Sequence, residues 1–362
     1  LLAEVQSWTK FLDSFTHYRT GETANDEAAL MAAILADATN AGAERMAESS
    51  RGVTIHQMML MVDRHLRSET YATATAVLVD AQQANPFAAV WGDGRLSSSD
   101  GQRFRAPPGT LIGAYHPRYF GHYDKAVTVY THVSDRIGVF ATQLISCAPR
   151  EATYVLDGLL ENDTSLDPRQ HTTDTHGFTE PLWGLCHLLG IDFMPRLKDL
   201  SDQRLWRPEG AAIPEDLDAL FAGTSETTLL IEQWDQLVRV AASLKARTAP
   251  AHVVLQRLTA GGPNDRVAKA LTTLGRLVKT RNVLCYLHDA PLRRRIQAQL
   301  NRGESRHALA RWLFFANQGE FRTSDYEAMM NRRVASACCR TRWCCGTPCK
   351  WRASSASCAP AA

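Results

Sequence analysis

The sequence has no apolar stretch long enough to cross a membrane. A transmembrane helix needs about 20 consecutive, mostly apolar residues, and the 362 residues contain no such run. The first residues, LLAEVQSWTKFLDSF, also lack the basic start and unbroken apolar core of a secretory signal peptide. We therefore expect no membrane contact and a cytoplasmic location. Because an initiator methionine is missing as well, we expect a fragment of a longer chain.

Most of the chain contains few cysteines and has no large excess of basic or acidic residues. Only Cys147, Cys186 and Cys285 precede residue 332, each in an apolar setting that is typical of a reduced core thiol. The 40 basic residues are nearly balanced by 38 acidic ones, and residues 332–362 hold six basic residues and no acidic one. The chain before them is therefore slightly acidic, so any DNA-binding surface must be local.

The cysteine- and arginine-rich tail, residues 332–362, leaves three interpretations open. Its thiolates could bind zinc, although no pair of CxxC knuckles is present. It could be a natural disordered tail. It could also be translated from a shifted reading frame, because back-translating Ser336–Cys358 and shifting by one base permits ERLLSNAVVLWNTVQMARIVGQL, which has an apolar pattern typical of a helix. We favour the frameshift and expect disorder in this tail.

The rest of the chain divides into four parts by pattern. Residues 1–85 have apolar residues at helical spacing and end at Asn85-Pro86, which breaks the pattern. Residues 86–205 alternate expected strands and helices, residues 206–301 are expected to be helical, and residues 302–331 contain a helix that Glu304 opens. The expected strands cover 88–94, 97–106, 126–135, 139–147, 171–177 and 191–197, and the expected helices among them cover 152–162 and 178–190.

This order predicts an α/β fold with a ribonuclease H-like core. We expect a mixed sheet with helices, a large all-helical insert at 206–301 and a helical segment in front of the core. That fold brings acidic residues from the first strand, a later strand and a late helix to one point. Asp93, Asp174 and Glu304 occupy such places in the sequence.

Three converging carboxylates favour hard cations such as Mg²⁺, and a pair of such ions can activate a nucleophile and stabilise a leaving oxygen in phosphoryl transfer. Each residue also has an ordinary structural explanation, since Asp tolerates turns and Glu is favoured in the first turn of a helix. Three other aspartates compete on similar terms: Asp100, Asp157 and Asp163.

A series of longer motifs makes the assignment more specific. They are WGDG (91–94), SSSDGQRFR (97–105), VTVYTHVSD (127–135), REATYVLDGLL (150–160), HTTDTHGFTE (171–180), RLKDLSDQRLW (196–206) and LRRRIQAQLNRGESRHALARWLFFANQGEFR (292–322). In this order they resemble the catalytic C-terminal part of transposases from class II, Tn-three-type replicative transposons. The resemblance covers nearly all of residues 1–331.

The resemblance implies a DDE triad of Asp93, Asp174 and Glu304 that binds Mg²⁺, with Mn²⁺ as an alternative. It also implies cleavage at the 3′ ends of a transposon, followed by attack of the freed 3′-OH on target DNA to form a cointegrate. The implied partners are double-stranded DNA, namely the terminal inverted repeats and the target, and a second copy of the full-length chain. We accordingly expect association with the bacterial nucleoid. Members of this family have several hundred upstream residues that recognise the inverted repeats and are absent from this sequence.

Basic residues gather near the proposed catalytic Glu. Between Arg276 and Arg311, nine basic residues accompany only Asp289 and Glu304. The functional interpretation is a phosphate-contacting surface, and the structural one is a solvated helix face. The candidates for DNA contact are Arg103, Arg293, Arg294, Arg295, Arg302 and Arg306. No alternation of aromatic and basic residues suggests a platform that stacks single strands.

Two other functions compete with an active transposase. One is an inactive, truncated and frameshifted remnant that at most binds DNA or the intact transposase. The other is a stand-alone nuclease of the same fold, which would cleave without transposon ends. Direct use of ATP is not supported, because no GxxxxGK[ST] phosphate loop is present.

Overall fold

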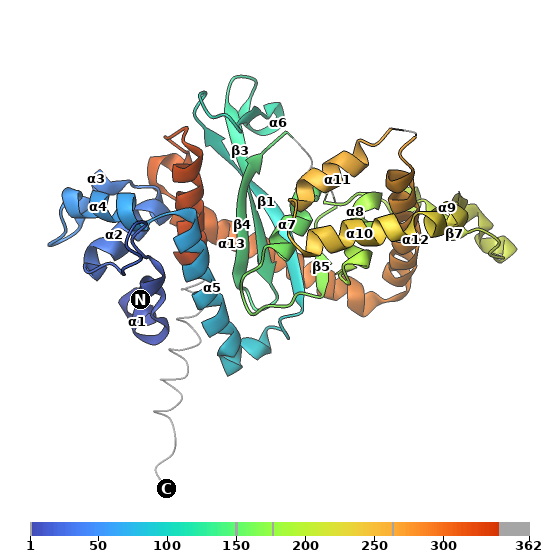
Figure 1. Ribbon diagram of the computed structural model, residues 1–362, viewed down its shortest axis with the longest axis horizontal. Coiled ribbons are helices and arrows are strands. Elements are labelled where there is room, and N and C mark those ends of the chain that lie inside the picture. The colour runs from blue at the N-terminus through green and yellow to red at the C-terminus, as the bar shows by residue number, and fades with distance from the viewer. Residues whose placement is uncertain (1, 149–150, 176, 263, 340–362) are drawn as a thin grey trace, which may run out of the picture.

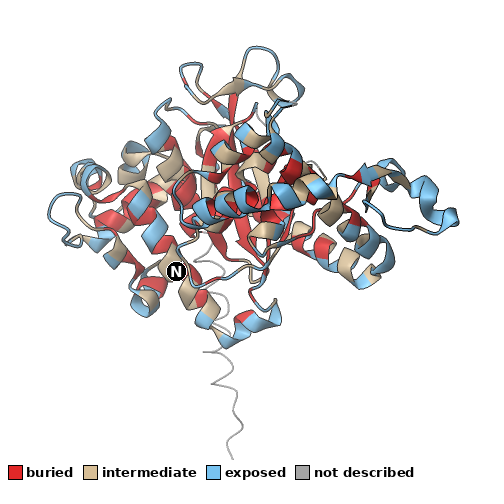
Figure 2. Cartoon of the chain, turned by 45° about the vertical axis from the view of Figure 1, so that its right-hand side comes forward, coloured by how far each residue is buried: buried red, intermediate tan, exposed pale blue. Residues whose placement is uncertain are grey.

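Figure 1 shows a computed structural model that describes residues 2–148, 151–175, 177–262 and 264–339. A group of N-terminal helices lies on one side of a central sheet, and helices from the second half of the chain lie on the other side. Buried residues run through all three parts (Figure 2). The predicted mixed α/β class is confirmed.

The N-terminal part is helical over residues 2–85, apart from its connecting loops. Two of its helices have clear capping signals: the Asp26 side chain accepts a hydrogen bond from the Ala29 N–H at 2.9 Å, and Thr54 and Gln57 form a capping box. The apolar faces of these helices share one core. The elements are α1 (Leu2–Thr9), the 3₁₀ helix η1 (Phe11–Ser14), α2 (Glu27–Thr39), α3 (Ala43–Ser49), α4 (Ile55–His65) and α5 (Ser68–Ala84).

Residues 326–339 form a helix that packs into this same N-terminal core. Val334, Ala335, Cys338 and Cys339 are buried there. The prediction that the tail is disordered is therefore wrong for 332–339, because its apolar side chains have a core to enter. Residues 340–362 lie outside the described part, so the frameshift hypothesis stays a prediction, and four of the six tail cysteines proposed for zinc lie there as well.

The central sheet combines antiparallel and parallel strands in the order β2–β3–β1–β5–β6, with β4 paired to β3. β1, β3 and β4 are antiparallel neighbours, whereas β5 runs parallel to β1 and β6 runs parallel to β5. The strands are β1 (Leu96–Ala106), β2 (Ala114–Tyr115), β3 (Lys125–Ser134), β4 (Val139–Ser146), β5 (Gln170–Thr172) and β6 (Asp192–Phe193). The strands and helices expected from 97–106 to 191–197 are present in the predicted order, with the short elements β2 and Pro117–Phe120 added between β1 and β3.

Two predictions near the proposed triad are wrong. Residues 88–94 are not a strand, because the 3₁₀ helix η2 (Pro86–Val90) and a loop fill this range, and the first strand begins only at Leu96. Glu304 does not open a helix, since it lies inside the continuous helix α13 (Ala290–Leu313). Asp93 therefore lies in the loop before the first strand, and Glu304 lies within a helix instead of at its start.

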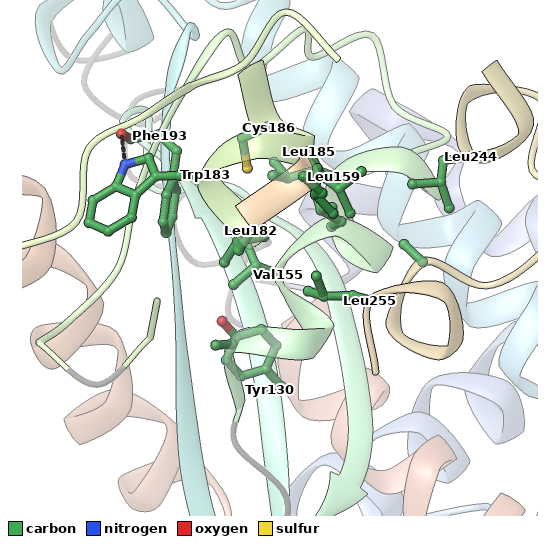
Figure 3. Packing of buried hydrophobic residues seen from close by; sticks show 14 of the residues in the cluster. Tyr130, Val155, Leu159, Leu182, Trp183, Leu185, Cys186, Phe193, Leu244 and Leu255 are labelled. Carbon is green, nitrogen blue, oxygen red and sulfur yellow. Dashed lines mark hydrogen bonds between the residues drawn. The ribbon is translucent and has the colours of Figure 1, made fainter. Parts of the chain in front are cut away.

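Helices cover both faces of the sheet. α7 (Val155–Leu160) and α8 (Glu180–Leu188) pack on one face and contribute to the largest apolar core, which includes Tyr130, Val155 and Trp183 (Figure 3). The Trp183 indole N–H donates to the Phe193 carbonyl at 3.1 Å and so ties α8 to β6. α13 packs on the other face of β1 through Gln299, whose side chain donates to Ser98 Oγ at 3.1 Å.

Residues 206–301 are mostly helical but contain a small parallel sheet, so the prediction of an all-helical insert is wrong in this respect. The two strands, β7 and β8, pair over Trp206–Pro208 and Gly223–Ser225. The elements of this part are β7 (Leu205–Pro208), η5 (Glu215–Leu220), β8 (Phe221–Ser225), α9 (Thr227–Glu232), α10 (Trp234–Lys245), α11 (Ala251–Thr259) and α12 (Arg266–His288), followed by α13. The remaining short helices are α6 (Pro117–Phe120), η3 (Glu151–Tyr154), η4 (Leu200–Asp202) and η6 (Ala316–Gly319).

Candidate active site

Two aspartates follow the paired part of the two central parallel strands. The register pairs Ser98 of β1 with Thr172 of β5. Asp100 and Asp174 each lie two residues further along, so the parallel register places them beside each other at the carboxyl end of β5. This juxtaposition assembles two of the acidic residues that the site needs.

The electrostatics of Asp100 confirm that acidic groups gather around it. The pKa of Asp100 is raised from 3.8 to about 7, mainly by burial and in addition by the negative charges of Asp174 and Glu151. The Gly101 N–H and the Arg306 guanidinium act in the opposite direction. A carboxylate in this position gains from a nearby cation, because that cation offsets both burial and repulsion.

Glu151 reaches this group from η3. Its carboxylate lies against the β1 backbone at Gly101, where a Cβ atom would stand 2.4 Å from Glu151 Oε2. Arg103 donates to Glu151 Oε1 at 2.8 Å. Only glycine at position 101 therefore leaves room for the carboxylate. Glu151 was not among the residues expected from the sequence. It is far from Asp100 along the chain, and only its packing against β1 in the structure identifies it.

α13 carries the last predicted acidic residue, Glu304. His307 Nδ1 lies 3.5 Å from Asp100 Oδ2, and the Gln102 side chain donates to the His307 carbonyl at 3.2 Å. Glu304 is one helical turn before His307 on the same side of α13, and its side chain is exposed. Among the described residues, no three His, Cys, Asp or Glu side chains are arranged to hold a metal ion.

His171 fixes the two central strands together beside Asp174. Its Nδ1 and Nε2 atoms lie 2.8 Å from the hydroxyls of Ser97 and Ser99, respectively. Burial lowers the pKa of His171 well below its usual value, so the ring is neutral. A neutral ring that bonds two hydroxyls on β1 has a structural role and sets the parallel register.

Asp93 lies elsewhere, at the start of β1. Its carboxylate accepts a hydrogen bond from the Arg95 N–H at 2.9 Å, which is a turn interaction. The loop wraps around Asp135, whose carboxylate would be 2.1 Å from a Cβ atom at Gly92. Asp100 is four residues beyond Leu96, about 13 Å along the strand at the usual rise. The close packing of Gly92 against Asp135 therefore explains the first glycine of the WGDG motif.

The predicted DNA-contacting arginines have different environments. Arg294 and Arg295 are exposed on α13, whereas Arg293 donates to the carbonyls of Tyr286 and Leu287 at the end of α12. Arg302 donates to the Trp91 carbonyl at 2.9 Å.

Arg306 is only 5% exposed, so it does not lie on a surface that DNA can contact. Burial lowers its pKa to about 10, and the Asp100 carboxylate partly offsets this effect. Its Nε and Nη2 atoms have no hydrogen-bond partner within the described ranges. A buried guanidinium with free donors next to an acidic cluster is costly unless the site uses its charge.

The chain is similar to known proteins over most of its length. A model of the family described as Tn3 transposase DDE domain matches residues 1–337. The chain is 43% identical over 337 residues to the transposase of transposon Tn3926 from Escherichia coli, covering 92% of this chain and 34% of that protein. It is 41% identical over 333 residues to the transposase of transposon Tn501 from Pseudomonas aeruginosa, with the same coverage of both chains. The chain thus spans about a third of the length of the curated relatives it matches.

The fold and the matches first define a class, that of the DDE polynucleotidyl transferases. The chain belongs to the Tn3 transposase DDE domain family. The resemblance drawn from the motifs is thereby confirmed, and the DDE domain implies a ribonuclease H-like fold, with which the observed strand order agrees. No helix in the described ranges is long and apolar enough to span a membrane.

Proposed function

We propose that this domain catalyses metal-dependent cleavage at the 3′ ends of a transposon and transfer of the freed 3′-OH into target DNA. The observation that supports this reaction is the pairing of Asp100 with Asp174 at the end of two parallel strands. The relatives are transposases by name, and a DDE domain generally requires a divalent metal ion. DNA is accordingly the proposed partner, as inverted repeats and target, for a full-length protein that acts as a dimer on the nucleoid in the cytoplasm.

In this proposal Asp100 takes the place that the sequence suggested for Asp93. Asp100, Asp174 and Glu304 supply only oxygen ligands, which fit Mg²⁺ or Mn²⁺. When bound, such ions stabilise charge at the phosphate and lower the pKa of the attacking group. The two aspartates come from rigid strands, whereas Glu304 is one turn from the His307–Asp100 contact and stays free to approach the pair.

The neighbouring side chains hold this geometry. His171 fixes β5 against β1, and Gln299 and Gln102 fix α13 over β1. Arg306 places positive charge close to Asp100 from inside the protein. We propose that Arg306 balances the carboxylates and thereby limits their mutual repulsion, instead of contacting DNA as the sequence suggested.

The test is a strand-cleavage and joining assay on a duplex with a transposon end, with and without Mg²⁺ or Mn²⁺. The expected result is product only with metal, lost in Asp174→Asn and Glu304→Gln variants that fold normally by circular dichroism. A pre-nicked end with a free 3′-OH separates joining from cleavage. Metal-independent cleavage, or full activity of Asp174→Asn, would contradict the proposal. A folded chain that binds the duplex without either reaction would favour the inactive remnant.

A further inference from the structure

A cavity of about 540 Å³ adjoins the acidic cluster at the edge of the sheet. β5 pairs only with Leu96–Ser98, so the second half of β1 continues past it to the cavity. The walls come from this half of β1, from α6 in the loop before β3, and from the end of α13 with η6. A cavity of this size lies in the range that proteins use for small organic groups.

Arginines and aromatic rings line the cavity together. Arg103, Arg105 and Arg311 contribute guanidinium groups, while Tyr119 and Phe315 contribute rings. Tyr119 is 57% exposed and Phe315 is 66% exposed, although the guanidinium groups of Arg103 and Arg118 lie over the Tyr119 ring. Glu320 is the only acidic residue among the described lining residues.

Neighbouring groups hold two of the arginines, Arg103 and Arg105, in place. The guanidinium carbon of Arg103 lies 5.4 Å from the centre of the Tyr119 ring, and Arg103 also pairs with Glu151 at 2.8 Å. Arg103 Nε has no hydrogen-bond partner within the described residues. Arg105 pairs with Glu320 at 2.9 Å. The donors are therefore oriented before any ligand arrives, which lowers the entropic cost of binding.

The position of the cavity relative to the acidic pair points to a ligand. Arg103 is three residues beyond Asp100 on β1, about 10 Å at the usual strand rise. Arg311 is one helical turn beyond His307, which itself contacts Asp100. The cavity therefore lies within reach of a DNA strand whose phosphate lies at Asp100 and Asp174.

We propose that the cavity binds an unpaired nucleobase together with its adjoining phosphate, beside the phosphate that reacts. Tyr119 and Phe315 offer faces for stacking, and the arginines offer donors to phosphate and to base oxygens. A base inside a duplex cannot reach these rings, so the ligand is a base that is unpaired or rotated out of the helix. Tyr119 and Arg311 are far apart in the sequence, and for this reason no local alternation of aromatic and basic residues predicts the site.

This inference rests on the proposed function, and a binding assay separates the two. The probes are a short duplex with one unpaired 2-aminopurine and the same duplex fully paired, both without divalent metal so that no strand is cut. The full chain is expected to bind the unpaired probe more tightly and to quench its fluorescence by stacking. Tyr119→Ala is expected to weaken that binding roughly 5- to 100-fold, the range for one stacked base.

Tyr123→Ala is the matched control, because Tyr123 belongs to the same loop, is 91% exposed and does not line the cavity. It is expected to bind both probes as the unaltered chain does. Arg311→Ala is expected to weaken binding and to reduce its salt dependence by about one phosphate contact. Equal affinity for the two probes, no binding of either probe, or full binding by Tyr119→Ala would overturn the inference.

An Asp174→Asn variant distinguishes failure of this inference from failure of the proposed function. If both are correct, this variant loses metal-dependent cleavage and still quenches the unpaired probe. Cleavage by Asp174→Asn would refute the proposed function and leave the base-binding result to be judged separately. Displacement of the probe by a poly-glutamate peptide, without any preference for the unpaired base, would identify the cavity as an acidic-peptide site and overturn the inference.

Discussion

Asp100 occupies a place that disfavours a carboxylate unless another group offsets its charge. It lies in the middle of a strand, under a helix and next to two acidic residues, and its pKa rises to about 7. Aspartate is also unfavourable in strands in general. A residue that conflicts with its local environment and lies beside similar groups is typical of a functional site. The cluster around Asp100 therefore fits the catalytic role that we propose for it.

Substitutions at Asp93 and Asp100 separate the turn from the active site. Asp100→Asn is expected to lower metal-dependent cleavage roughly 100-fold or more, because it removes a charged ligand of the proposed metal ion. Asp93→Asn is expected to change the rate less than roughly fivefold, since the amide oxygen still accepts from the Arg95 N–H. Rates are measured with the same duplex and metal concentration. An inactive Asp93→Asn with an active Asp100→Asn would restore the triad suggested by the sequence.

At the scale of elements, the crossing of α8 and α12 attaches the second half of the chain to the core. A Cβ atom at Gly275 would lie 1.8 Å from the Glu180 carbonyl, and one at Gly184 would lie 2.8 Å from the Leu271 carbonyl. Both neighbours are backbone atoms, which cannot rotate away. Because α8 follows Asp174 closely in the chain, this crossing also supports the segment that leaves the active site.

Gly275→Ala is expected to separate the two helices and to lower the free energy of unfolding by roughly 1–3 kcal/mol, the usual cost of overpacking. The measurement is urea unfolding followed by circular dichroism. Gly262→Ala is the matched control: no atom lies within 4 Å of the place that its Cβ atom would take, and its backbone is not in the left-handed region. Equal stability of the Gly275→Ala variant and the unaltered chain would show that the helices can move apart without cost.

The contact between α2 and α5 predicts a dependence of stability on pH. The Tyr71 hydroxyl donates to Asp37 Oδ2 at 3.0 Å, and burial raises the pKa of Asp37 from 3.8 to about 6. The folded state therefore keeps a proton that the unfolded chain has lost, and this difference in proton binding stabilises the fold at low pH. The stabilisation is lost as the pH rises from about 4 to about 6.

Asp37→Asn removes this titration. The unfolding free energy of the unaltered chain minus that of the variant is expected to fall by roughly 2 kcal/mol between about pH 4 and about pH 7. Urea unfolding at several pH values measures it, with Asp13→Asn as the control on η1. A difference that stays constant, or that rises with pH, would contradict the raised pKa.

The same elements show what the sequence can and cannot predict. The alternation of Val and Tyr with small polar residues at 126–135 predicts β3, because successive side chains of a strand point to opposite faces of the sheet. The strand expected at 88–94 fails, because Gly92 packs against Asp135, a partner far along the chain. The pairing of Asp100 with Asp174 depends on the register of two strands that no local pattern encodes. Asp100 was one of three alternative aspartates in the sequence, and only its position beside Asp174 in the structure distinguishes it from the other two.

At the scale of the whole molecule, distant parts of the chain share one core. Residues 326–339 complete the core of the N-terminal helices, and Arg333 joins that core to the sheet. The Arg333 guanidinium carbon lies 3.9 Å from the centre of the Phe104 ring of β1 and 4.5 Å from that of Phe314, after α13. We infer that the N-terminal helices, β1 and the helix at 326–339 unfold together.

Ala335→Asp tests this coupling, because Ala335 is fully buried in the shared core. An uncompensated buried charge is expected to lower the unfolding free energy by roughly 3 kcal/mol or more. Hydrogen exchange is expected to accelerate in α2 and α5 as well as in 326–339. Glu327→Ala, exposed on the same helix, serves as the control and should leave exchange unchanged. Faster exchange confined to 326–339 would show that this helix detaches alone and that the N-terminal core holds together without it.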